Sequence, residues 1–222
     1  MPSSAARRSA GDANEATRSA RKRAAILDAA ATAFLRNGYR GTSMDEIAAL
    51  ARVSKQTVYK RFADKESLFS EIVATAVDQA AERVHAAALS LQDTGDIESD
   101  LRDVGRELLA QAMQPRILQL RRLVIGEAGR FPELGRLFYN QGPRRTITAL
   151  ATSFDRLAAR GALRLDDPQL AAAHFNWLVM SIPLNQAMLL GEDEPLPSAE
   201  LDRYADAGVR AFLAAYGHPR TA

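Results

Sequence analysis

The chain has 222 residues, of which 47% are hydrophobic and 25% are charged, as is typical of a folded globular protein. It contains no cysteine, which excludes disulfides and thiolate metal sites, and no apolar run approaches the roughly 20 residues of a membrane span. The polar N-terminus has no apolar segment after its charges. We therefore expect no secretion signal, no membrane attachment and a cytoplasmic location.

The net charge of +2 is unevenly distributed along the chain. Residues 1–61 carry 12 Lys and Arg against 5 Asp and Glu, whereas the remainder carries 17 against 22. This asymmetry predicts that one end of the chain meets a polyanion. A disordered basic tail would explain only part of the excess, because Lys55, Lys60 and Arg61 lie in a segment with helical periodicity.

The apolar spacing after the N-terminus is helical, and no strand-like alternation appears, so the expected fold class is all-α. Residues 1–17 are rich in Ser, Ala, Gly and Arg and are expected to form a disordered basic arm. The first predicted helix covers about 17–37 and ends at Gly38, which suits a left-handed stop. The later predicted helices cover about 97–113, 116–129, 143–160, 168–190 and 199–216.

Capping residues predict the starts of three helices near the N-terminus. Ser43 and Glu46 have the spacing of a capping box, and Ser54 precedes a short helix over about 55–61. Asp64 caps a long helix that runs to about Leu91. This last helix would connect the basic part of the chain to the remainder.

The two helices between Ser43 and Phe62 have the pattern of a helix-turn-helix. Their apolar residues can pack them together and onto the first helix, which leaves polar and basic side chains outside. The second helix of such a motif enters the DNA major groove through its N-terminal residues. An ordinary three-helix unit with a solvated basic face is the alternative. The outward side chains are Lys55, Gln56, Thr57, Tyr59, Lys60 and Arg61.

Residues 25–69 resemble the DNA-binding domain of TetR-family transcriptional regulators through the motifs GYRGTS, IA before VS, TVYKRF and DKESLF. The resemblance implies that Lys55 and Gln56 contact base edges. It also implies that Ser43 caps its helix near the DNA backbone. Gln56 departs from the glycine frequent in the family, which affects the base choice. The phosphate contacts implied by the resemblance are Thr57, Tyr59 and Lys65, with Lys60 and Arg61 nearby.

Residues 123–150, LVIGEAGRFPELGRLFYNQGPRRTITAL, are similar to the AefR-like C-terminal domain found in part of this family. This resemblance implies a ligand-binding and dimerising helical region. The expected organisation is therefore a helix-turn-helix domain over 18–64 and a larger domain over 65–222. The helices covering 170–190 and 201–216 are the predicted dimer interface.

The helix predicted over 168–190 is apolar almost all round, which indicates burial on several sides. A polar row on one of its faces could line a small-molecule pocket, hydrogen-bond across a dimer interface, or be satisfied within the core. These three interpretations stay open. Arg121 and Arg122 are interpreted as surface charges, although a buried arginine there would favour an anionic ligand. The candidate pocket wall is Met113, Phe154, His174, Trp177 and Ser181.

No pattern in the sequence indicates catalysis. The three histidines are not clustered, and the phosphate-cradling glycine and nucleophile-elbow motifs are absent. The acidic pair at 166–167 and the three acidic residues at 192–194 are interpreted as solvated loop charges. We expect no catalytic residue, no metal site and no cofactor.

These observations predict a sequence-specific DNA-binding regulator, a homodimeric repressor that leaves a palindromic double-stranded operator when a small-molecule effector binds. Repression, as opposed to activation, comes from the resemblance. Two alternatives remain. One is an architectural protein with little sequence preference. The other is a helical small-molecule-binding protein or enzyme with an incidental basic surface.

Overall fold

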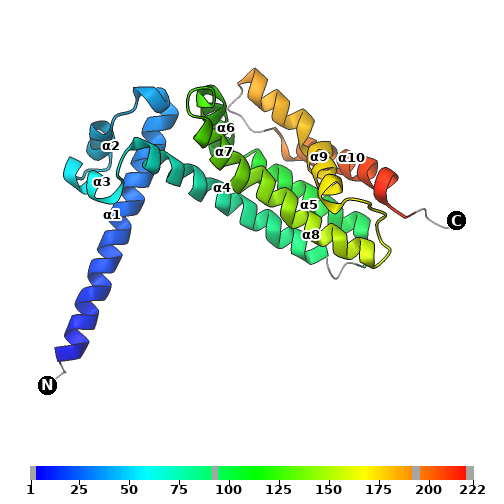
Figure 1. Ribbon diagram of the computed structural model, residues 1–222, viewed down its shortest axis with the longest axis horizontal. Coiled ribbons are helices and arrows are strands. Elements are labelled where there is room, and N and C mark those ends of the chain that lie inside the picture. Colours follow the sequence, from blue (N-terminus) through cyan, green and yellow to red (C-terminus); the bar gives the residue numbers. More distant parts are fainter. Residues whose placement is uncertain (1–3, 92–94, 192–195, 219–222) are drawn as a thin grey trace. The chain divides into compact units, whose positions relative to one another are not determined.

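A computed structural model describes residues 4–91, 95–191 and 196–218 (Figure 1). The described residues form helices and no strand, apart from one isolated bridge between Leu163 and Gly217, which confirms the all-α fold. The chain divides into two compact units, Met1–Val73 and Ala74–Ala222. The predicted turn over 92–96 and the acidic residues at 192–194 lie largely outside the described residues.

The first unit contains α1 (Ser4–Gly41), α2 (Met44–Leu50), α3 (Lys55–Arg61) and the first turns of α4 (Lys65–Ser90). A disordered arm was expected over residues 1–17, whereas in the structure α1 begins at Ser4. Alanine and arginine are frequent between residues 4 and 16, and both favour helix. Gly38 has a φ of 73° and marks a kink in α1, next to the predicted helix end.

The predicted caps of α2 and α3 form as expected. Ser43 Oγ accepts a hydrogen bond from the backbone N–H of Glu46 at 3.1 Å, and Ser54 Oγ accepts from that of Thr57 at 3.2 Å. The reciprocal half of the capping box is replaced, since the Glu46 carboxylate accepts from Asn37 Nδ2 at 2.7 Å. This bond ties the start of α2 to the end of α1.

The first turns of α4 pack against α1 through three aromatic rings. Phe69 lies 5.0 Å from Phe34 and 5.2 Å from Tyr39 between ring centroids, both in edge-to-face geometry. Asp64 caps α4 as predicted, accepting from the Ser67 N–H at 2.7 Å. The boundary between the units therefore follows Val73 and not residue 64, because Phe69 belongs to the first core.

The second unit consists of the later turns of α4 and the helices that follow. Most observed helix ends differ from the predicted ones by one or two residues, but α7 was not predicted. No described helix is both long and apolar enough to cross a membrane. The helices are α5 (Ile97–Ala112), α6 (Pro115–Glu127), α7 (Pro132–Tyr139), η2 (Asn140–Arg144), α8 (Arg145–Ala159), α9 (Pro168–Leu190) and α10 (Ser198–Tyr216).

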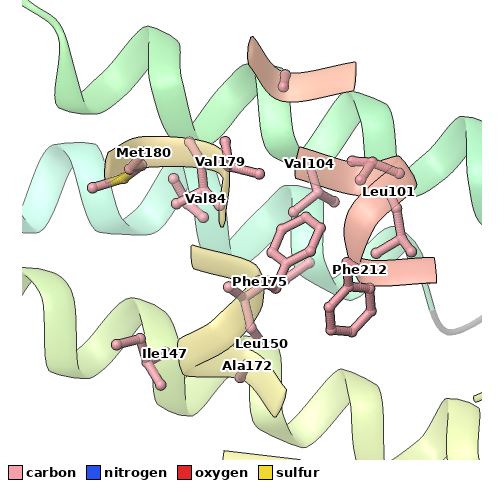
Figure 2. Close-up of a cluster of buried hydrophobic side chains, with 14 of the residues drawn as sticks. Val84, Leu101, Val104, Ile147, Leu150, Ala172, Phe175, Val179, Met180 and Phe212 are labelled. Carbon is pink, nitrogen blue, oxygen red and sulfur yellow. The ribbon is translucent and has the colours of Figure 1, made fainter. Parts of the chain in front are cut away.

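The core of the second unit lies between α4, α5, α8, α9 and α10. Figure 2 shows Phe175 of α9 beside Phe212 of α10, and their ring centroids are 5.2 Å apart. Phe154 of α8 completes an aromatic cluster with centroids 5.6 Å from Phe175 and 5.1 Å from Phe212. All three side chains are fully buried, so α9 is held on two sides by neighbouring helices.

The predicted helix start at Pro143 is wrong by two residues, because Pro143 lies inside the π-helical segment η2 that joins α7 to α8. Proline has no backbone N–H and cannot donate the regular helical hydrogen bond. A widened π-helical turn accommodates this loss. Gly142, in the same segment, is buried against α4: a Cβ atom at this position would lie 2.8 Å from Val77 Cγ1.

Gly208 allows α10 to approach α9 closely. A Cβ atom at this position would lie 2.9 Å from Val179 Cγ2 and 3.0 Å from the Leu178 carbonyl. We expect Gly208→Ala to lower the free energy of unfolding by about 1–3 kcal/mol, since overpacking forces rigid backbone apart. The matched control Gly126→Ala in α6 meets no atom within 4 Å and should be neutral or slightly stabilising. Equal values for both variants in denaturant unfolding would contradict this account.

Candidate DNA-binding surface and ligand cavity

The turn between α2 and α3 fixes the direction of α3. Arg52 adopts a left-handed conformation with a φ of 54°. The N–H of Arg52 bonds the Ala49 carbonyl at 3.2 Å, and that of Val53 bonds the Ala48 carbonyl at 3.0 Å. This is the pair of bonds of a Schellman motif, which ends one helix sharply. The chain can therefore restart as α3 after only a few residues.

The N-terminal part of α3 presents polar side chains to solvent. Lys55, Gln56, Tyr59 and Lys60 are exposed, whereas Val58 is fully buried on the opposite face. One face of the helix thus packs in the core, and the other is accessible to a binding partner. Lysine can donate to guanine and glutamine can pair with adenine, so these residue types suit base readout.

Lys55 is paired within the unit. Its Nζ lies 2.7 Å from one carboxylate oxygen of Asp45 and 3.0 Å from the other. The hydrogen bond and the charge of Asp45 raise the pKa of Lys55 above its ordinary value. Both side chains are exposed, and Asp45 therefore competes with a polyanion for this cation.

Three other predicted contact residues also form hydrogen bonds within the first unit. Arg61 Nη2 donates to Ser19 Oγ of α1 at 2.9 Å. Thr57 is half-buried, and its hydroxyl lies 2.8 Å from that of Ser54. Ser43 is exposed at the start of α2, where it acts as the helix cap.

Lys65 has partners that the sequence did not indicate. Its Nζ donates to the carbonyls of Tyr39 at 2.7 Å, Thr42 at 3.0 Å and Arg40 at 3.5 Å, and it lies 4.6 Å over the Tyr39 ring. These carbonyls follow the kink in α1, and the ammonium holds them together. The predicted phosphate contact would require Lys65 to exchange or share these bonds.

The second unit contains a cavity that encloses about 470 Å³ of empty space, including the part that opens to solvent. Its wall is mostly apolar, with a few polar side chains from α5, α6, α8 and α9. The lining residues are Val77, Ala80, Ala81, Val84, Leu108, Gln111, Ala112, Ile117, Arg121, Phe138, Gly142, Pro143, Thr146, Asn176 and Met180.

None of the five residues of the predicted pocket wall lines this cavity. Met113 and Phe154 are buried in the core, and Ser181 is half-buried. His174 lies on the protein surface, with its Nδ1 2.5 Å from the hydroxyl of Tyr216. Trp177 is 43% exposed.

The cavity uses another face of α9 than the predicted pocket wall. Asn176 and Met180 line the cavity, and at 100° per residue they lie about 130° around the helix from the row through His174 and Ser181. The buried Asn176 was the available signal in the sequence, since a polar residue among apolar neighbours at helical spacing marks a special position. Gln111 and Thr146 are buried polar residues of the same kind.

Two family models match the chain. Residues 26–72 match the bacterial regulatory proteins of the tetR family, and residues 99–218 match the AefR-like transcriptional repressor C-terminal domain. The second match alone covers more than half of the chain. The protein belongs to the TetR family.

Solved structures of TetR-family regulators resemble the whole chain. A regulator from Mesorhizobium loti is 44% identical, with a TM-score of 0.84 over 90% of this chain and 99% of that one. The flavonoid-responsive regulator FrrA is 34% identical, with a TM-score of 0.70 over 91% of this chain and 100% of that one. The TetR-family assignment thus holds for both units, and DNA-binding transcriptional regulation is the function of this family.

Curated transcriptional regulators match a shorter part of the chain. YhgD of Bacillus subtilis, a transcriptional regulator, is 42% identical over 62 residues, which are 28% of this chain and 32% of the relative. The repressor TetR of Mycobacteroides abscessus is 38% identical over 80 residues, 35% of this chain and 37% of that one. The matched part thus spans about a third of the length of each of these two relatives.

No group of three or more His, Cys, Asp or Glu side chains that could hold a metal ion occurs in the described part of the chain. The two candidate sites are the exposed basic face of α3 and the largely apolar cavity of the second unit.

The pairing of Asp45 with Lys55 generates a prediction about DNA affinity. We expect Asp45→Asn to raise the affinity for non-specific DNA and to steepen its salt dependence by about one unit of log–log slope, because one more cation becomes available to phosphate. Fluorescence anisotropy across a salt series measures both quantities. The matched control is the double variant Asp45→Asn, Lys55→Met, in which the gain should disappear. A gain that persists without Lys55 would contradict the assignment.

Proposed function

We propose that the protein is a homodimeric repressor that binds a palindromic operator and leaves it when a small molecule occupies the cavity of the second unit. The observation that carries this proposal is the exposed polar face of α3, which begins with Lys55 and Gln56 directly after a tight turn. Such a helix docks its N-terminal side chains against base edges. The operator as partner implies that the protein acts in the cytoplasm.

Dimerisation is supported by the apolar surface of α9. Six large hydrophobic side chains of this helix are exposed, although the helix contributes another face to the core. Apolar patches of this kind mark interaction sites. A second copy of the chain would cover them and would supply the second recognition helix that a palindrome requires. The exposed residues are Leu170, Trp177, Leu178, Ile182, Leu189 and Leu190.

Release by an effector is supported by the position of the cavity along α4. Val77, Ala81 and Val84 of α4 form part of its wall, whereas Phe69, two turns earlier, packs in the first unit. A ligand releases DNA only if it binds the released geometry more tightly than the DNA-bound one, and couplings of about 1–3 kcal/mol are typical. The name of the relative FrrA, a flavonoid-responsive regulator, also supports response to a small molecule.

Selection of bound sequences from a random DNA pool tests the proposed function. We expect one palindromic sequence to be enriched, with half-sites about one helical turn or a multiple apart. Lys55→Ala and Gln56→Ala should each change the free-energy preference among the four bases at one half-site position by about 1–3 kcal/mol. Arg156→Ala, which removes an exposed charge from α8, is the matched control and should leave the selected sequence unchanged.

Enrichment of no shared sequence would favour an architectural DNA-binding protein. Unchanged preference in both Lys55→Ala and Gln56→Ala would show that other residues contact the bases.

Ile182, which is 54% exposed in the middle of α9, provides a test of the dimer. We expect Ile182→Glu to convert the protein to a monomer at micromolar concentration, because a buried unpaired carboxylate is costly at an apolar interface. Sedimentation velocity measures the state of assembly. Thr152→Glu adds the same charge at an exposed position of α8, outside the proposed interface, and should leave the dimer intact. A wild-type protein that sediments as a monomer would refute the dimer itself.

A further inference from the structure

Arg121 of α6 lines the cavity and has no ionic partner among the described residues. Its Nε atom is buried without a hydrogen-bond acceptor, and its guanidinium carbon lies 5.0 Å over the ring of Phe138, another lining residue. Burial lowers the pKa of Arg121 below its ordinary value, with no acidic group opposing the shift. The side chain nevertheless stays protonated, as arginine does in proteins.

The neighbouring arginine has a different role. Arg122 Nη2 donates to the carbonyl of Ala187 at 3.2 Å and thereby ties α6 to α9. Arg121 forms no such tie to the backbone of another helix. Two adjacent arginines on one helix therefore differ: Arg122 links two helices, whereas Arg121 lines the cavity.

A second polar group of the cavity wall is also without a partner. Asn176 of α9 is 1% exposed, and its Nδ2 amide donates to no acceptor in the structure. Thr146 of α8 is buried in the same wall. An unsatisfied buried amide is costly, and so is a guanidinium nitrogen that is buried without an acceptor. Both groups offer N–H donors that have no acceptor in the structure, and only Arg121 also carries a positive charge.

We infer that the cavity binds a carboxylate on an apolar body, with the carboxylate paired to Arg121 and hydrogen-bonded by Asn176. Guanidinium and carboxylate match in planar, two-bond geometry, and such charge-assisted bonds are strong away from water. The remaining wall, including Val84, Leu108 and Met180, suits an alkyl or aryl body. This inference rests on the proposed function in one respect, the use of this cavity as the effector site.

The test compares carboxylates with their uncharged primary amides, which have nearly the same shape. Naphthalene-2-carboxylate and decanoate, each beside its amide, are titrated into the full chain without DNA and followed by calorimetry. We expect each carboxylate to bind at least tenfold more tightly than its amide. In Arg121→Met this preference should fall to about onefold, while Arg116→Met, which removes an exposed charge from the same helix, should retain it.

Thermal melting of the ligand-free variants provides a second measurement. Arg121→Met should remain folded and melt near the wild-type temperature, since loss of the contact with Phe138 opposes the removal of a charge that has no ionic partner. A carboxylate preference that persists in the folded Arg121→Met protein would overturn the inference. It would also be overturned if no carboxylate binds more tightly than its amide to the wild-type chain.

The inference and the proposed function can fail separately. Carboxylates that bind with the expected preference but leave operator affinity unchanged would support the ligand class and refute release by this cavity. A neutral amide that binds as tightly as its carboxylate and releases the operator would support release and refute the ligand class.

Discussion

The packing of Phe69 against Phe34 and Tyr39 is the contact on which the rest of the structure depends. It places the first turns of α4 in the core of the DNA-binding unit, and each aromatic pair contributes about 0.5–1.5 kcal/mol beyond its buried area. Lys65 and the ion pair between Arg23 and Glu71 reinforce the same junction. A movement of α4 would therefore carry the helix-turn-helix with it.

The later turns of α4 are confined just as closely. Gly142 leaves room for Val77 where a methyl group would collide, and Val77 also lines the cavity. A ligand that fills the cavity must press against this helix or replace empty space beside it. Close-packed interiors respond to such insertions by discrete shifts and not by compression. The helix whose later turns line the cavity is the same helix whose first turns pack in the DNA-binding unit.

Features set by neighbouring residues were predictable from the sequence. The caps at Ser43, Ser54 and Asp64 depend on contacts three residues apart, and all three begin their helices as expected. For the face of α9 that lines the cavity, neighbouring residues gave only the signal of Asn176 among apolar side chains, because the wall is completed by helices far away in the sequence. The hydrogen bonds of Lys65 were likewise not predictable from neighbouring residues, since its carbonyl partners lie more than 20 residues earlier.

The distance between the two DNA-binding units of a dimer tests the coupling through α4 most directly. The chain has no cysteine, so Ala25→Cys, an exposed position of α1, introduces one spin label per subunit for pulsed electron resonance. On the selected operator we predict a single narrow distance. Addition of the carboxylate that binds most tightly should release the DNA and move or broaden this distance. An identical distance distribution with and without a carboxylate that releases the operator would contradict the account.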